Sequence, residues 1–383
     1  MNNLNRIDPN DELSCCGCLA CEDVCPQGAI SMTENEKGFF MPSIDEDKCI
    51  NCGLCLKVCD FKKPHQTKSN IERAFSLVVN DKTVLKNSTS GGAFTALSDV
   101  ILDHSGCVVG SVMEKDFAIR HIIAKDKTSR DRMRGSKYVQ SSTEKIWKQV
   151  KTLLSQGKEV LFTGTPCQCA ALRSFLGRDY DNLIVVDLLC HGVPNDKLFK
   201  DHISYLNNYY NNDIEAYSFR DKHYGWDSYT NVVTLQNGKR KAKWINQIYY
   251  SFFVKSVSLR PSCFNCVYRS LHRPSDITIA DFWGYDKISG RKNNKGVSLV
   301  LIHNEKGQDL VDKCGMYSEM HDVELNRIAS NIRTKPTSSK LNVESFWQTY
   351  QKGGYVALID KYFVNSFSQK LRFKIRCIVK RIE

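Results

Sequence analysis

Two runs of four cysteines share one spacing, and they constrain the fold of this chain more than any other feature. The first run is Cys15-x2-Cys18-x2-Cys21-x3-Cys25, and the second is Cys49-x2-Cys52-x2-Cys55-x3-Cys59. Three thiolates at this spacing can surround one cubane cluster from a single loop, while the fourth reaches the neighbouring cluster. The spacing therefore predicts two 4Fe-4S clusters with crossed ligation. One would be held by Cys15, Cys18, Cys21 and Cys59, and the other by Cys49, Cys52, Cys55 and Cys25.

Residues 1–66 resemble a two-cluster bacterial-type ferredoxin, a small α+β iron-sulfur domain. Between the cysteine runs, the apolar segments 29–32 and 38–41 flank a polar turn, which predicts a β-hairpin. The chain departs from the ferredoxin pattern in that Asp60, not proline, follows Cys59, and we expect no ligand role for the extra Cys16. Two zinc ions are the alternative occupants, but zinc sites usually use separated cysteine pairs and not triplets.

The composition indicates a cytoplasmic protein. The N-terminus lacks the apolar segment of a signal peptide, and no window approaches 18 consecutive apolar residues. Residues 1–60 contain 4 basic and 11 acidic side chains, a net charge of −7, although the whole chain carries +12. An acidic head on a basic body can dock within the chain, bind an acidic protein partner or bind a phosphate-bearing ligand. No nucleic-acid recognition motif accompanies the charge, so we do not expect nucleic acid as a partner.

From about residue 70, apolar strands alternate with amphipathic helices, which predicts an α/β domain with a mixed sheet and flanking helices. Segments 160–163 and 183–189 are expected to be parallel strands joined by a helix at 170–176. The stretch "STSGG" (88–92) precedes a helical segment and offers backbone amides suited to phosphate. An ordinary capped, glycine-rich turn is the alternative.

Four cysteines of this second part have the context of a site. Cys167 and Cys190 follow the two predicted parallel strands, so both should lie at the sheet edge where α/β proteins bind ligands. Cys263 and Cys266 form a CxxC pair. Four thiols suit a third 4Fe-4S cluster, with a zinc ion as the alternative. The remaining cysteines are expected to be core or surface thiols: Cys107, Cys169, Cys314 and Cys377.

Six motifs follow one another in a specific order: "STSGGAFTAL", "GSKYVQS", "GTPCQCAAL", "DLLCHGVP", "SFRDKHYGW" and "CFNC" with "DITIADFWG". With these motifs, residues 70–335 resemble the coenzyme F-420 hydrogenase/dehydrogenase beta-subunit family. The resemblance implies a domain that binds FAD and a 4Fe-4S cluster, and it supports Cys167, Cys190, Cys263 and Cys266 as the cluster ligands. It also implies a redox partner protein or subunit, because no other subunit is encoded in this chain.

The resemblance also implies a flavin site. Its contacts would be Ser88, Ser90, Gly91, Gly92, Lys137, Tyr138, Gln140, Thr165, Pro166 and Gln168. Three residues are candidates for chemistry: Lys137 beside the flavin, His191 for proton transfer or cluster tuning, and Arg220 for substrate contact. Each has an ordinary alternative as a solvated lysine, a structural histidine or a loop residue.

Residues 336–383 form a basic tail in which apolar residues recur every four positions, as in Ile359, Phe363, Phe367, Leu371, Ile375 and Val379. Such a helix can lie on an anionic membrane surface or dock on the body of the protein.

These observations lead to the expectation of an iron-sulfur flavoprotein oxidoreductase. It would pass electrons between 4Fe-4S clusters and FAD, and transfer hydride to or from a deazaflavin-type or other small organic substrate. The alternatives are a non-catalytic electron-transfer adaptor subunit and a reductase of a biosynthetic pathway, such as cell-surface polysaccharide synthesis.

Overall fold

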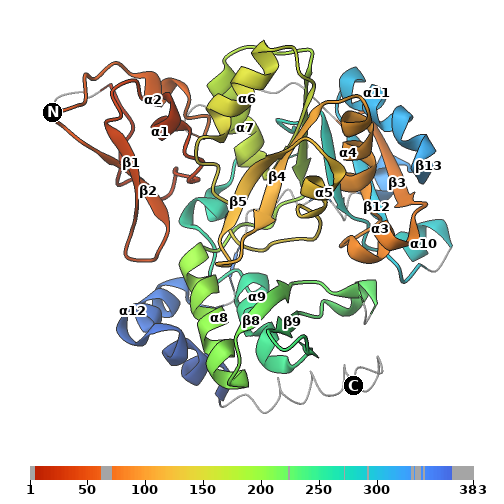
Figure 1. Ribbon diagram of the computed structural model, residues 1–383. Helices are drawn as coiled ribbons and strands as arrows, with labels where there is room; N and C mark the ends of the chain where they lie inside the picture. Colours follow the sequence, from red (N-terminus) through yellow and green to blue (C-terminus); the bar gives the residue numbers. More distant parts are fainter. Residues whose placement is uncertain are drawn as a thin grey trace.

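The computed structural model describes residues 5–61, 71–222, 225–270, 272–290, 293–328, 332, 338–339 and 341–364. Figure 1 shows three parts: an N-terminal unit, a large sheet with helices on its faces, and a lobe beneath them that contains α8, α9 and α12.

The N-terminal unit is built around the predicted hairpin. Strands β1 (Ile30–Glu34) and β2 (Phe40–Ile44) pair antiparallel. A short helix lies within each cysteine run, α1 (Ala20–Val24) in the first and α2 (Leu54–Lys57) in the second. The ferredoxin-like expectation for this region is confirmed.

The central sheet has eight strands in the order β13-β3-β12-β11-β7-β6-β4-β5. Neighbours β4, β6, β7 and β11 are parallel, whereas the pairs toward both edges are antiparallel, so the predicted mixed sheet is confirmed. The predicted parallel pair is β6 and β7, joined by α7. The strands span Arg73–Val79 (β3), Cys107–Met113 (β4), Ile119–Ala124 (β5), Val160–Gly164 (β6), Leu183–Leu188 (β7), Ile277–Asp281 (β11), Ser298–Ile302 (β12) and Ser318–Asp322 (β13).

Helices cover both faces of this sheet, which explains why its central strands are continuously apolar. In β4, Val108 and Val112 pack into the core beneath α4 and α11, whereas Cys107 and Val109 pack into the core beneath α6 and α7. The helices of this part span Lys82–Asn87 (α3), Ala93–Asp103 (α4), Lys127–Asp131 (α5), Ile146–Ser155 (α6), Pro166–Leu176 (α7), Tyr285–Ser289 (α10) and Glu305–Lys313 (α11).

The lobe has a core of its own, rich in aromatic side chains. A three-stranded sheet of β8 (Ile214–Ser218), β9 (Val232–Leu235) and β10 (Arg240–Lys241) packs with α8 (Asp196–Tyr210) and α9 (Ile248–Val254).

Helix α12 (Val343–Ile359) lies beside α8 and adds Phe346 and Trp347 to the core of the lobe. The described part of the predicted basic tail is therefore packed against the protein: Ile359 and Phe363 are buried there. Phe367, Leu371, Ile375 and Val379 lie outside the described residues. No helix of the described ranges is long and apolar enough to cross a bilayer.

Candidate functional site

The N-terminal cysteines fall into the two sets that the spacing predicts. Cys25 of the first run lines the same small cavity as Cys49, Cys52 and Cys55 of the second. Conversely, Cys21 lies within electrostatic range of Cys15, Cys18 and Cys59. The exchange of one cysteine between the runs is the arrangement that crossed ligation requires.

The part of the chain after residue 70 is called the body below. Its four candidate ligands line one cavity of about 40 Å³: Cys167, Cys190, Cys263 and Cys266. Cys167 lies in the first turn of α7, Cys190 follows β7, and Cys263 and Cys266 lie in and after the 3-10 turn Pro261–Asn265. In the described part of the chain, no three His, Cys, Asp or Glu side chains converge closely enough to hold a metal ion. The four thiols thus surround a space and do not meet at one point.

The first turn of α7 positions Cys167. Pro166 occupies the first helical position, where its missing N–H costs no hydrogen bond. The backbone N–H of Thr165 donates to Oε1 of Gln168 (3.0 Å), and Nε2 of Gln168 donates to the carbonyl of Ser141 (3.1 Å). The predicted flavin contacts Thr165 and Gln168 therefore also fix the turn that carries a cysteine.

The body thiols differ in acidity. Burial raises the pKa of Cys263 to about 12 and of Cys266 to about 11, and it raises the pKa of Cys190 further. The pKa of Cys167 is lowered to about 7, chiefly because Cys16 hydrogen-bonds to it. Cys167 is therefore the thiol of this set that ionises most readily. This matters because metals and clusters bind thiolates and not thiols.

Cys16 lies between the two cysteine-rich regions. Its thiol hydrogen-bonds to Cys167 of the body and to Cys18 of the first run, and it lines the small body cavity. The sequence assigned this residue no role, because nothing in the spacing shows that its loop docks on α7.

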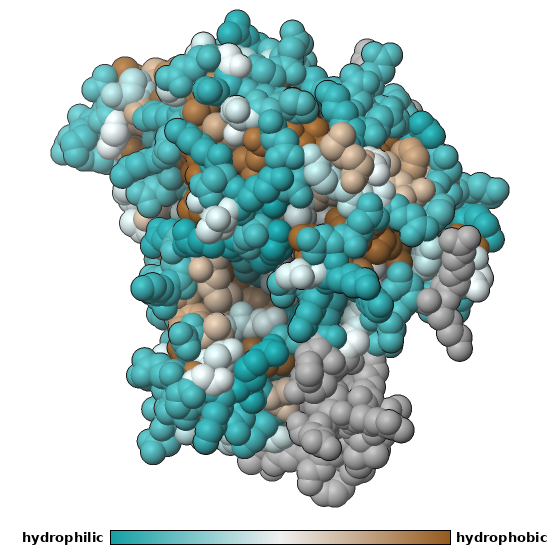
Figure 2. All heavy atoms as spheres, turned by 45° about the vertical axis from the view of Figure 1, so that its right-hand side comes forward, coloured by the Kyte–Doolittle hydropathy of each residue, from teal (hydrophilic) through white to brown (hydrophobic). Residues whose placement is uncertain are grey.

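A second cavity, of about 1110 Å³, lies at the same edge of the sheet. Apolar side chains show at the surface where the molecule narrows between its upper part and the lobe (Figure 2). The lining of this large cavity includes most of the predicted site residues: Ser88, Ser90, Gly92, Lys137, Tyr138, Gln140, Thr165, Gln168, His191 and Arg220. Gly91 and Pro166 are not in the lining. A Cβ on Gly91 would lie 2.0 Å from the carbonyl oxygen of Leu77, so this glycine permits close packing on β3.

One end of the large cavity suits an anion. The turn 88–92 leads into α4, whose N-terminus has no side-chain cap, and Gly92 adopts a φ of 92° there. The hydroxyl groups of Ser88 and Ser90 donate to the carbonyls of Val84 and Val297, both at 2.7 Å, and so hold the turn in place.

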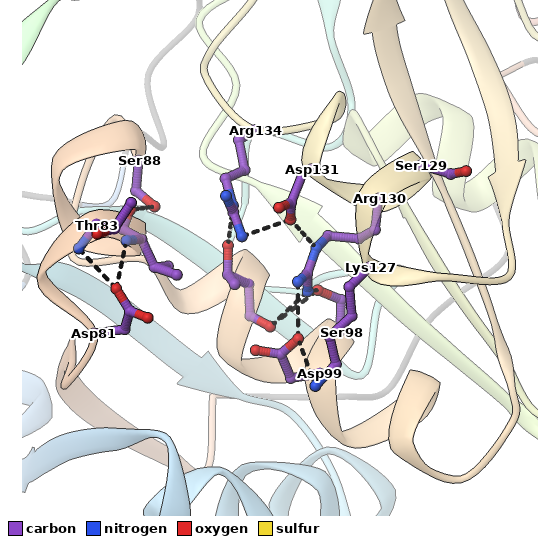
Figure 3. Close-up of polar contacts among 12 residues, drawn as sticks. Asp81, Thr83, Ser88, Ser98, Asp99, Lys127, Ser129, Arg130, Asp131 and Arg134 are labelled. Atoms are coloured by element: carbon purple, nitrogen blue, oxygen red, sulfur yellow. Dashed lines mark hydrogen bonds and ion pairs between the residues drawn. The ribbon is translucent and has the colours of Figure 1, made fainter.

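Arg134 adds a cation to this end, and sequence reasoning missed it. The guanidinium donates to Oγ1 of Thr95 (3.1 Å) and pairs with Asp131 (2.5 Å). Figure 3 shows Asp131 between Arg134 and Arg130, with Arg130 also bound to Asp99 and Ser98 of α4. The network fixes Arg134 in the cavity wall beside the start of α4.

Another part of the cavity wall is aromatic. The rings of Trp283 and Tyr229 stack at 5.1 Å, and Trp226 stacks on Trp283 at 4.7 Å. Arg220 lies about equally far from two of these rings, with its guanidinium carbon 5.1 Å from Tyr229 and 5.0 Å from Trp283. It is buried and forms an ion pair with Asp281. Such an arrangement presents flat apolar faces and one fixed cation to a ligand.

Lys137 is enclosed by backbone carbonyls. Its Nζ donates to the carbonyls of Ser111 (3.0 Å), Met133 (2.7 Å) and Arg134 (3.1 Å). Burial lowers the pKa of Lys137 to about 7. This group can therefore gain or lose a proton near neutral pH while it lines the cavity.

His191 lies between the two cavities and lines both. Its Nε2 forms a hydrogen bond with Oγ of Ser256 (2.9 Å), and its ring packs edge-on against Phe253. Gln140 lines the large cavity and also contacts the N-terminal unit, because its Nε2 donates to the carbonyls of Cys16 (2.9 Å) and Gly17 (3.2 Å).

Comparison with protein families gives two matches. Residues 157–328 match the family described as the C terminus of the coenzyme F420 hydrogenase/dehydrogenase beta subunit. Residues 14–63 match the 4Fe-4S dicluster domain.

Individual relatives match parts of the chain. One subunit of the F(420)H(2) dehydrogenase of Methanosarcina mazei is 21% identical over 48% of this chain and 56% of its own length. One subunit of the ion-translocating oxidoreductase complex of Methanosarcina acetivorans is 45% identical over 51 residues, 13% of this chain and 17% of its own length. An uncharacterized ferredoxin of Methanocaldococcus jannaschii is 39% identical over 13% of this chain and 62% of its own length. The chain thus spans less than two thirds of each of these relatives.

One solved structure, of the F420-reducing NiFe hydrogenase complex from Methanosarcina barkeri, contains a chain with 18% identity to this one. The match has a TM-score of 0.47 and covers 78% of this chain and 93% of that chain.

Proposed function

From the premise that the chain joins a 4Fe-4S dicluster domain to a region of the coenzyme F-420 hydrogenase/dehydrogenase beta-subunit family, we propose that it is an iron-sulfur flavoprotein oxidoreductase. It would hold three 4Fe-4S clusters and one FAD, and exchange electrons between the clusters and a small organic hydride donor or acceptor.

The contact between the two cavities is the observation that carries this proposal. Thr165, Cys167, Cys190 and His191 line both the small cavity of four thiols and the large cavity. A cluster in the first would therefore share wall residues with a cofactor in the second. Electron transfer between redox centres needs such proximity, whereas a purely structural metal site does not.

The large cavity fits FAD in size and in chemistry. Its volume of about 1110 Å³ lies slightly above the range of about 300–1,000 Å³ that is typical of small-molecule sites, as a large dinucleotide requires. The uncapped start of α4 and Arg134 suit the pyrophosphate, and the aromatic wall at Trp283 and Tyr229 suits a planar ring. A bound flavin supplies exchange of single electrons on one side and of hydride on the other.

Three residues of the chain would serve this chemistry. Lys137 can hold or release a proton at Nζ near neutral pH, because its pKa lies at about 7. Arg220 is held rigidly by Asp281 and offers a fixed cation to the substrate. His191 fixes the boundary between the cavities through its bond to Ser256.

The substrate we propose first is a deazaflavin coenzyme, since the Methanosarcina mazei relative is named as a dehydrogenase of the reduced form of that coenzyme. A biosynthetic intermediate is the alternative substrate. The acidic N-terminal unit would exchange electrons with a partner protein or subunit.

Anaerobic purification, followed by iron, sulfide, zinc and flavin analysis, tests the cofactors. We expect about twelve iron atoms and one FAD per chain. Zinc in place of four irons, or no flavin, would refute the proposal. Bleaching of the deazaflavin with a low-potential donor then tests the reaction. A fully loaded protein that oxidises and reduces no organic substrate would be an adaptor and not an enzyme.

A further inference from the structure

Arg260 lies at the junction of the N-terminal unit and the body, and only 1% of it is exposed. Its Nε donates to the carbonyl of Cys15 (2.7 Å), and Nη2 donates to the carbonyl of Phe40 (2.7 Å) and approaches Sγ of Cys15 (3.5 Å). Nη1 donates to Oε1 of Gln140 (3.0 Å). None of these acceptors is a carboxylate, so the guanidinium is a buried charge held by neutral groups and a thiol.

A buried charge without a counter-charge is costly, and proteins normally pair it. Arg260 is placed between two sets of thiols that could supply the missing negative charge. Its charge acts on Cys18 of the N-terminal unit and on Cys167 and Cys263 of the body. It also lines the small cavity formed by the body thiols.

We propose that Arg260 is the shared counter-cation of two iron-sulfur clusters, one at Cys15, Cys18, Cys21 and Cys59 and one at the four body thiols. The inference rests on the proposed function for the body cluster. A 4Fe-4S cluster with four thiolates is an anion, and its potential depends on nearby charge and on hydrogen bonds to its sulfurs. A fixed cation favours the more negative, reduced form, so Arg260 raises the reduction potentials of both clusters.

Other contacts of the same loop are uncharged. Thr143 Oγ1 and Trp147 Nε1 both donate to the carbonyl of Cys18 at 2.8 Å. These neutral contacts hold the loop on the body but bring no charge to the clusters. A variant that removes one of these contacts therefore tests the effect of docking on the cluster potentials separately from the effect of charge.

The test uses the full chain, purified anaerobically, with EPR-monitored redox titration and iron analysis. Arg260→Gln removes the charge and keeps a hydrogen-bond donor, whereas Arg260→Lys keeps the charge. Thr143→Val removes a neutral docking contact. Arg120→Gln removes a half-exposed arginine that pairs with Glu144, and so controls for loss of a surface charge. The cluster expected at Cys25, Cys49, Cys52 and Cys55 is an internal control.

We expect Arg260→Gln to move two of the three cluster potentials to more negative values and to leave the third unchanged. Arg260→Lys should keep the potentials of both clusters at the wild-type values, and Thr143→Val and Arg120→Gln should show no shift. Unchanged potentials in an iron-loaded Arg260→Gln protein would overturn the inference. If that variant loses iron, an iron-loaded Arg260→Lys protein decides, and potentials shifted to more negative values there would also overturn it.

Failure of the proposed function is a separate result. A wild-type protein with two clusters and no third refutes the body cluster. Arg260→Gln would then have to shift the reduction potential of the cluster at Cys15, Cys18, Cys21 and Cys59 alone. The absence of that shift would overturn the inference as well.

Discussion

Replacement of Cys167 by serine tests the body cluster, and the neighbouring Cys169 provides a matched control. Both cysteines belong to α7, two residues apart. Cys167 lines the cavity of the four thiols, whereas Cys169 is fully buried in the core beneath α6 and α7. The same chemical change therefore removes an expected cluster ligand in one variant and a core side chain in the other.

The magnitudes follow from these positions. Three sets of four cysteines predict about twelve irons, so Cys167→Ser should leave about eight irons per chain. Cys169→Ser should keep about twelve. It buries a hydroxyl group close to the carbonyl of Val186, which Sγ of Cys169 approaches at 3.6 Å, and should cost about 1–3 kcal/mol of stability at most.

The assay is iron and sulfide analysis with EPR of the reduced protein, supported by the thermal unfolding midpoint. The N-terminal signals should persist in both variants. The reasoning fails if Cys167→Ser retains all of its iron, or if Cys169→Ser loses four irons while its unfolding midpoint stays unchanged.

Three further predictions concern single side chains. Arg134→Gln should weaken FAD binding roughly tenfold to a hundredfold in a flavin titration, because a charged hydrogen bond contributes about 1.5–3 kcal/mol; unchanged affinity would refute the phosphate assignment. Burial lowers the pKa of Lys137 from 10.5 to about 7, so between these values only the unfolded state carries the proton, and raising the pH favours the folded state. The stability of the wild type relative to Lys137→Met should therefore rise by up to about 1.4 kcal/mol per pH unit between pH 7.5 and 9, and a pH-independent difference in unfolding midpoints would contradict this. Gly17→Ala should expose the N-terminal unit to limited proteolysis, because Gly17 has a φ of 64° and a Cβ there would lie 2.6 Å from Nε2 of Gln140; an unchanged digestion pattern would argue against tight docking.

Local patterns were enough to predict much of this fold. The β6-α7-β7 unit has apolar strands and a helix of ordinary length, so its order and parallel pairing follow from the sequence. The dicluster domain was equally accessible, because the spacing within each N-terminal cysteine run is a local property. The lobe was not, since its strands have only two to five residues and 3-10 turns lie between and after them. Its core is formed by aromatic side chains from α8, α9 and α12, which are far apart in the sequence.

The residues that the sequence could not identify are single side chains without a motif. Arg134 and Arg260 resemble any other arginine of a basic chain. Their roles depend on what lies opposite them, the start of α4 for one and the loop of Cys15 for the other. Such pairings join residues that are 39 and 245 positions apart, so spacing alone could not reveal them.

Asp60 shows how a departure from a family pattern gains a physical reason in the folded chain. Bacterial-type ferredoxins would have proline after the last cysteine, and the side chain of proline has no atom that can accept a hydrogen bond. The buried carboxylate of Asp60 accepts hydrogen bonds from Oγ of Ser174 in α7 (2.8 Å) and from the hydroxyl of Tyr268 (2.5 Å), two residues after Cys266. It therefore ties the loop of Cys59 to two of the three segments that carry body thiols, α7 and the turn of Cys263 and Cys266. The departure from the ferredoxin pattern at Asp60 thus has a structural reason, the attachment of the N-terminal unit to the rest of the chain.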